Sequence, residues 1–128
     1  MTYLTVEQIL FLHARLINEI GGSHGVRDLG LLLSAGGRPQ ASFEGQEFYP
    51  DLFSKAAALL DSLVRNHPFI DGNKRTGVSA AGVFLVRNGF HLTASNPNLE
   101  ALAMAVAQSK MTAEAIASWL REHSVLME

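Results

Sequence analysis

Apolar residues recur every three or four positions along most of the chain, the period of an amphipathic α-helix. In the first such segment Thr5 and Gln8 have the form of a capping box, and Gly21-Gly22 ends the run. Five more segments share this period and are bounded by capping or breaking residues: 28–37, 51–66, 73–88, 96–108 and a last one opened by Thr112. The pattern predicts an all-α fold of six helices.

One stretch, residues 38–50, breaks the helical period. It holds Pro39, Gly45 and Pro50 among several aromatic residues, a composition typical of turns and short strands. We therefore expect an extended flap or a small hairpin here, between the second and third helices.

The predicted helix 73–88 is apolar on nearly all sides, being rich in alanine and valine and containing Phe84 and Leu85. A helix without a polar face is usually surrounded by other elements. We expect this helix to be central and buried, with the segment that precedes it joining it to helix 51–66.

The composition fits a single globular domain spanning residues 1–128. The chain is 48% hydrophobic and 17% charged, which excludes a disordered polar chain. It contains no cysteine, so a disulfide framework, a thiolate zinc site and a cysteine nucleophile are all excluded.

The formal net charge is −2, which disfavours a protein that coats nucleic acid. The most apolar stretch, Val78–Val86, is far shorter than the about 20 residues that cross a membrane. Glu7, His13 and Arg15 interrupt the region where a signal peptide would be apolar. We expect a cytoplasmic protein that binds neither membranes nor nucleic acid directly.

Most of the candidate chemistry lies between His67 and Gly77, in the segment His-Pro-Phe-Ile-Asp-Gly-Asn-Lys-Arg-Thr-Gly. A helix that starts near Asn73 leaves its first backbone N–H groups unpaired, and Gly72 allows a ligand to approach them closely. Lys74 and Arg75 add two positive charges, although cations oppose the helix dipole at that end. This combination predicts a phosphate site.

Two further side chains of this segment indicate which reaction it could catalyse. Asp71 would face a phosphate unfavourably unless Mg²⁺ lay between them, and Mg²⁺ takes one or two carboxylates and completes its shell with phosphate oxygens and water. His67 is suited to remove a proton from a hydroxyl group. Together these residues indicate phosphoryl or nucleotidyl transfer to a hydroxyl. Taken singly, each also fits ordinary turn chemistry.

The remaining histidines show no zinc-ligand pairing. His13 falls on the apolar side of the first helix, so we expect a hydrogen-bonded core residue there. Phe69 is expected to bury its ring between the two helices and to anchor the loop that carries His67. His24 and His91 receive no role.

Residues His67–Arg75 resemble the motif His-Pro-Phe-x-Asp-Gly-Asn-Gly/Lys-Arg of the Fic/Doc superfamily, and Lys74 is the form found in its death-on-curing (Doc) branch. The resemblance extends over about residues 3–92 and includes the segments 21–28, 31–39, 43–50, 55–57 and 84–89. It implies the compact six-helix Fic/Doc-type bundle with a flap, and an active-site loop between two central helices.

The branch also sets the expected reaction. Fic proteins that transfer AMP have glycine where this chain has Lys74, and a second arginine where it has Val78. The departures resemble Doc proteins, which transfer the γ-phosphate of ATP. The resemblance implies a base at His67, Mg²⁺ on Asp71, and phosphate contacts from Gly72, Asn73, Lys74, Arg75 and, more weakly, Arg65.

The resemblance further implies a toxin that phosphorylates a threonine of elongation factor Tu and so blocks translation. Some Fic proteins carry an internal inhibitory motif, Ser/Thr-x-x-x-Glu-Gly/Asn, which this chain lacks. The expected restraint is therefore a separate, Phd-like antitoxin. Phe43, Phe48 and Tyr49 of the flap either contact the target or antitoxin, or simply pack on the core.

Two other functions remain open on the same residues. An AMP transferase would move the α-phosphate with its nucleoside, so ATP labelled at the α or the γ position separates it from the kinase. A non-catalytic binding module would act by occupying a partner, and its effect on growth would survive the loss of His67.

Overall fold

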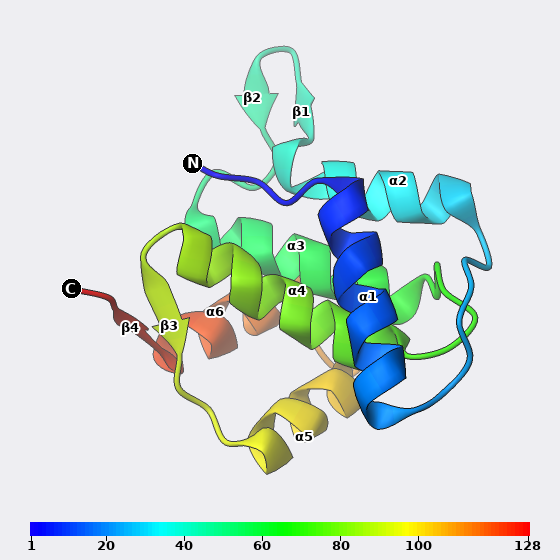
Figure 1. Cartoon of the computed structure of the whole chain (residues 1–128). Helices are drawn as coiled ribbons and strands as arrows, with labels where there is room; N and C mark the ends of the chain where they lie inside the picture. The colour runs from blue at the N-terminus through cyan, green and yellow to red at the C-terminus, as the bar shows by residue number, and fades with distance from the viewer.

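Six α-helices account for most of the 128 residues, all of which the computed structural model describes (Figure 1). The elements, in chain order, are α1 (Val6–Ile20), α2 (Leu29–Gly37), the 3-10 turn η1 (Arg38–Gln40), β1 (Ser42–Phe43), β2 (Gln46–Glu47), α3 (Leu52–Arg65), α4 (Asn73–Arg87), β3 (Phe90–Leu92), α5 (Asn96–Ala107), α6 (Ala113–Glu122) and β4 (Ser124–Leu126). The predicted all-α class and the number of helices are confirmed. None of the six helices has both the length and the apolar character that crossing a membrane requires.

Side-chain caps explain why the helices start where they do. Thr5 and Gln8 form the predicted capping box at the start of α1. Asp28, Asp51 and Thr112 each accept a hydrogen bond from a backbone N–H in the first turn of α2, α3 and α6. These boundaries follow from residues close together in sequence, so the predictions for them are correct within a residue.

α4, which we expected to be central and buried, packs against α1, α3, α5 and β3, but α3 is the more deeply buried of the two helices. Every residue from Lys55 to Val64 is buried, because α3 packs against α2, α4, α5 and α6. α4 contributes Phe84 and Leu85 to the core but leaves Val83 and Val86 exposed. The hydrophobic pattern did not predict the central position of α3, because its buried part contains polar residues.

The structure also contains two small antiparallel strand pairs. β1 and β2 form a hairpin in the predicted flap, and Figure 1 shows it projecting from the helical body. β3 and β4 pair Phe90 with Leu126 and so attach the C-terminal segment beside the end of α4. The sequence did not predict this second pair, because strands of three residues carry almost no periodic signal.

Candidate active site

The histidine motif lies in the connection between α3 and α4, residues 66–72, here called the motif loop. Phe69 at its centre is buried, whereas His67 and Asp71 on either side of it are exposed. In Figure 1 the loop (green) lies beside the connection between α1 and α2. The motif loop thus has a buried anchor and two polar side chains that face solvent.

Phe69 is buried, as predicted, and its ring packs on α1. Its ring stacks on the imidazole of His13, with the ring centroids 3.8 Å apart and the planes nearly parallel. The Nε2 atom of His13 lies 2.8 Å from the main-chain oxygen of Asp71. Since a carbonyl oxygen only accepts, Nε2 carries the proton and donates it. His13 is therefore the hydrogen-bonded core residue that we expected, and it also supports the motif loop.

Asn73 supports the same loop from α4. Its Nδ2 donates to the main-chain oxygen of Phe69 and its Oδ1 accepts from the Phe69 N–H, both at 3.0 Å. The side chain is buried. Because the side chain holds the loop, the phosphate contact predicted for Asn73 would have to come from its main-chain N–H.

A second support comes from residues 22–28, here called the clamp segment, to which the sequence analysis gave no role in the site. The N–H of Ile70 donates to the oxygen of Gly25, and the N–H groups of Arg27 and Asp28 both donate to the oxygen of Pro68. Val26 and Phe69 form an isolated antiparallel bridge. The glycines of 21–25 signal irregular backbone, but only the folded chain shows which loop it touches.

His67 lies at the surface of the motif loop. Its imidazole is exposed, and the Nδ2 atom of Asn73 lies 3.5 Å from its Nδ1, the outer limit of a hydrogen bond. The backbone of His67 has φ of +49°, a left-handed conformation that few non-glycine residues adopt. Such backbone persists only where the surroundings hold it, and it is common at functional sites.

The carboxylate of Asp71 is oriented by two backbone donors. Its Oδ2 accepts from the N–H of Ser23 at 3.0 Å and its Oδ1 from the N–H of Gly72 at 2.8 Å. These hydrogen bonds, the one from Ser23 most strongly, lower the pKa of Asp71 below its usual value. A Cβ atom on Gly22, which has φ of +115°, would lie 2.7 Å from Oδ2, so this position needs glycine.

The tip of α4 is open. Gly72, its N-cap, has a left-handed backbone and no side-chain hydrogen bond to the first turn. The N-caps of the other five helices, by contrast, all provide such a bond. The N–H groups at the start of α4 are therefore free for an anion in front of them.

Two unpaired cations stand at this tip. Lys74 and Arg75 are exposed and take part in none of the five ion pairs of the molecule. Arg65, at the end of α3, is also exposed, but its Nη1 lies 3.6 Å from Oδ1 of Asp61. The structure thus brings His67, Asp71, Gly72, Lys74 and Arg75 together, with Arg65 at the edge of the group.

The flap residues are not part of this group. No hydrogen bond or ion pair joins the hairpin to the motif loop. The hairpin folds back on α3 instead, where Tyr49 is linked through Arg38 to Asp61. Phe43 and Phe48 are 65% and 61% exposed and do not pack on the core. Tyr49 is partly buried, and its hydroxyl accepts from Nε of Arg38 at 2.8 Å. Of the two interpretations, core packing holds for Tyr49 only.

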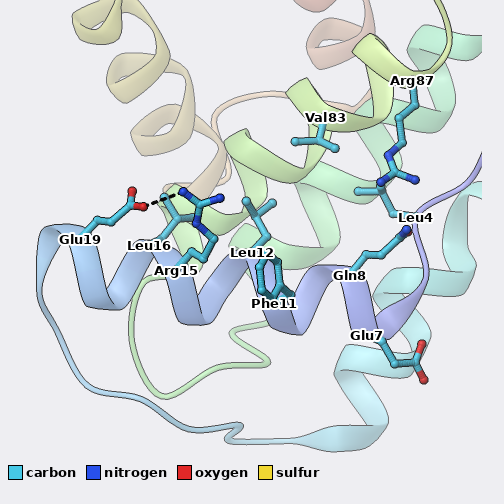
Figure 2. A pocket seen from close by; sticks show the side chains of 10 residues that line it. All are labelled: Leu4, Glu7, Gln8, Phe11, Leu12, Arg15, Leu16, Glu19, Val83 and Arg87. Carbon is cyan, nitrogen blue, oxygen red and sulfur yellow. Dashed lines mark hydrogen bonds and ion pairs between the residues drawn. The ribbon is translucent and has the colours of Figure 1, made fainter.

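A groove of about 550 Å³ lies elsewhere, on the outer side of α1 next to α4. Figure 2 shows the side chains that line it, with Phe11 on α1 and Val83 on α4 among them, and the Arg15–Glu19 ion pair at one end. No residue of the motif loop lines this groove. The candidate phosphate site is an open surface at the tip of α4, not this groove.

The sequence is similar to those of known proteins. A family model described as the Fic/DOC family matches residues 3–85. The chain is 35% identical to the protein kinase doc of Escherichia phage P1 over 121 residues, which are 94% of each chain. It is 57% identical to the toxin Doc of Mycolicibacterium smegmatis over 74 residues, which span 58% of this chain and 57% of that toxin. With the motif loop, the helix tip and the six helices in the arrangement that the sequence implied, the chain belongs to the Fic/DOC family.

Proposed function

We propose that this protein is a Doc-type toxin kinase, which transfers the γ-phosphate of ATP to a hydroxyl of a translation factor. The observation that carries the proposal is the open tip of α4, where Lys74 and Arg75 lack partners and the exposed imidazole of His67 lies in the adjoining loop. Two unpaired cations oppose the dipole of their own helix. Their placement is favourable once a polyphosphate lies in front of them.

The choice of the γ-phosphate depends on two residues. Lys74 stands where AMP-transferring Fic proteins have glycine, and Val78 where they have a second arginine. The lysine side chain adds charge beside the helix tip, while the missing arginine weakens the other phosphate position. The name of the phage P1 relative, protein kinase doc, supports the same choice.

In the proposed reaction, one imidazole nitrogen of His67 accepts the proton of the target hydroxyl. The hydroxyl oxygen forms a bond to the γ-phosphorus as the bond from this phosphorus to the β,γ-bridging oxygen breaks, and ADP leaves. Arg75 can hold two phosphate oxygens through its planar fork, and Lys74 supplies a mobile charge. The N–H groups at the tip of α4 fix the position of the phosphates.

Asp71 fits the role of a magnesium ligand. It is ionised, because its pKa is lowered, and each carboxylate oxygen keeps a lone pair after accepting one backbone hydrogen bond. A single carboxylate suits Mg²⁺, which takes its remaining ligands from phosphate and water. When bound, the ion neutralises charge on the phosphates.

We further propose that the target is elongation factor Tu in the cytoplasm and that a separate Phd-like antitoxin restrains the toxin. Both relatives are Doc proteins, and one is named as a toxin. The exposed Phe43 and Phe48 offer a protein partner an apolar contact outside the motif loop. A macromolecular partner is large enough to reach both places.

The test incubates the purified protein with a bacterial extract, Mg²⁺ and ATP labelled at either the α or the γ position. We expect label from the γ position on a single protein of the extract. His67→Ala lowers the rate by about 10²–10⁴-fold, the usual contribution of a general base. His91→Ala, which removes an exposed histidine on β3, leaves the rate unchanged.

The other outcomes contradict the proposal in distinct ways. Label from the α position would make the protein an AMP transferase. No transfer from either position, with growth arrest that survives His67→Ala, would make it a binding module. Growth arrest that a co-expressed Phd-like protein fails to relieve would contradict the proposed antitoxin.

A further inference from the structure

The clamp segment 22–28 contains one long side chain that the proposed reaction does not use. Arg27 is exposed, lies outside the motif, and takes part in no ion pair. Its guanidinium nevertheless donates two hydrogen bonds to the motif loop. Nε donates to the main-chain oxygen of His67 at 2.6 Å, and Nη2 donates to that of Asn66 at 2.8 Å.

These two carbonyl groups follow the last turn of α3. Asn66 is the C-cap of α3, and the last carbonyl groups of a helix receive no hydrogen bond from an N–H of the same helix. A cation at this end also matches the negative end of the helix dipole. Arg27 therefore satisfies the end of α3 from a different part of the chain, 39 and 40 residues away in sequence.

The same contact holds the backbone that carries the base. His67 has its left-handed φ of +49°, and the next residue, Pro68, accepts hydrogen bonds from the N–H groups of Arg27 and Asp28. The peptide groups on both sides of the His67–Pro68 bond are thus held by the clamp segment. A left-handed residue needs such support to stay in place.

From these contacts we infer that Arg27 is a positioning residue for His67. It fixes where the imidazole stands relative to the tip of α4, and it does not bind the nucleotide. Nε and one hydrogen of Nη2, which form one bidentate edge of the guanidinium, are used by carbonyl groups of the motif loop, and Nη1 and the second hydrogen of Nη2 keep their donors. The inference rests on the proposed phosphate transfer for its kinetic test, and on the backbone of His67 alone for its structural test.

The kinetic test replaces Arg27 with methionine and with lysine. Arg27→Met is expected to lower kcat for phosphate transfer by about 10–100-fold, in line with a misplaced reacting group. The affinity for ATP with Mg²⁺, measured by calorimetry, is expected to stay within about twofold. Arg27→Lys keeps one donor and is expected to restore part of the rate. Arg15→Met, which removes an exposed arginine that pairs only with Glu19, serves as the control.

A double variant separates positioning from an independent effect. If Arg27 acts only through His67, adding Arg27→Met to His67→Ala causes no further loss of rate. A further tenfold loss in that background would overturn the inference. A fall in ATP affinity that matches the fall in kcat would overturn it as well, because Arg27 would then be a phosphate ligand.

The structural test needs no activity. The three-bond coupling between the amide and Hα protons reports φ, and in the wild-type protein it should show His67 in the left-handed conformation. We expect this coupling to change in Arg27→Met and to return toward the wild-type value in Arg27→Lys. An unchanged coupling in Arg27→Met would overturn the inference, even if the protein proved not to transfer phosphate at all.

Discussion

Two sets of cations in this molecule have opposite surroundings. Lys55 is buried, and its Nζ lies 2.9 Å from the oxygen of Pro39 and 2.6 Å from Oε1 of Glu47. Lys74 and Arg75, by contrast, are exposed to solvent and have no hydrogen bond or ion pair within the protein. The buried cation is paired with groups of its own chain, whereas the two exposed cations are free to bind an anion from solution.

Arg38 belongs with Lys55. Its Nη1 donates to Asp61 at 2.8 Å, and its Nε donates to the hydroxyl of Tyr49. Burial by itself would lower the pKa of Lys55 and Arg38, but hydrogen bonds to Glu47 and to Asp61 respectively raise it above the usual value. Both cations tie the flap to the body of the molecule, since Glu47 and Tyr49 lie in or next to the hairpin.

The difference teaches how to tell a structural charge from a functional one in this fold. A buried cation must be paired, or its burial would oppose folding. A pair of cations at the wrong end of a helix has no such reason within the folded chain. The removal of each kind should therefore change different properties.

The largest effect is expected at the functional cations. Arg75→Gln should lower the rate of phosphate transfer by about 10²–10³-fold, the usual loss when one donor to a developing charge is removed. The measurement is transfer of γ-label to protein. Arg121→Gln removes another exposed arginine, paired to Asp51 at the N-terminal end of α3, and should leave the rate unchanged. A rate within twofold of wild type for Arg75→Gln would contradict the proposed site.

A smaller effect, on folding, is expected at the structural cation. Lys55→Met should lower the free energy of unfolding by about 1–3 kcal/mol, because the carbonyl of Pro39 is then left unpaired in a buried place. Urea denaturation measures this loss. Lys110→Met, at an exposed lysine, should stay within about 0.5 kcal/mol of wild type. If Lys55→Met were as stable as wild type, the hydrogen bonds of Lys55 would only compensate its burial.

The smallest effect has the opposite sign. Lys74→Gln should raise the free energy of unfolding by about 0.3–1 kcal/mol at low salt, since it removes a cation from the positive end of the α4 dipole. High salt should abolish the gain by screening the charge. The measurement is urea denaturation without nucleotide at two ionic strengths. A loss of stability at low salt would mean that Lys74 has a structural partner.

Local features were predictable from the sequence because their causes lie within a few residues. Thr5 with Gln8 set the start of α1, and Asp51 set the start of α3. The anchoring role of Phe69 and the exposure of a loop between two apolar helices also followed from neighbouring residues. The position of the flap beside α3 did not, because it depends on contacts between residues far apart in sequence, such as that of Arg38 with Asp61.

The order of residues along the chain was enough to determine six helices, the motif loop between α3 and α4, and the family to which both belong. Only the tertiary structure decided that α3 is the innermost helix, that Asn73 supports the loop with its side chain, and that Arg27 holds the backbone of His67. The physical reason is the range of the interactions involved. Caps and periodicity act within one or two turns, whereas a carbonyl group finds its donor 40 residues away only once the chain has packed.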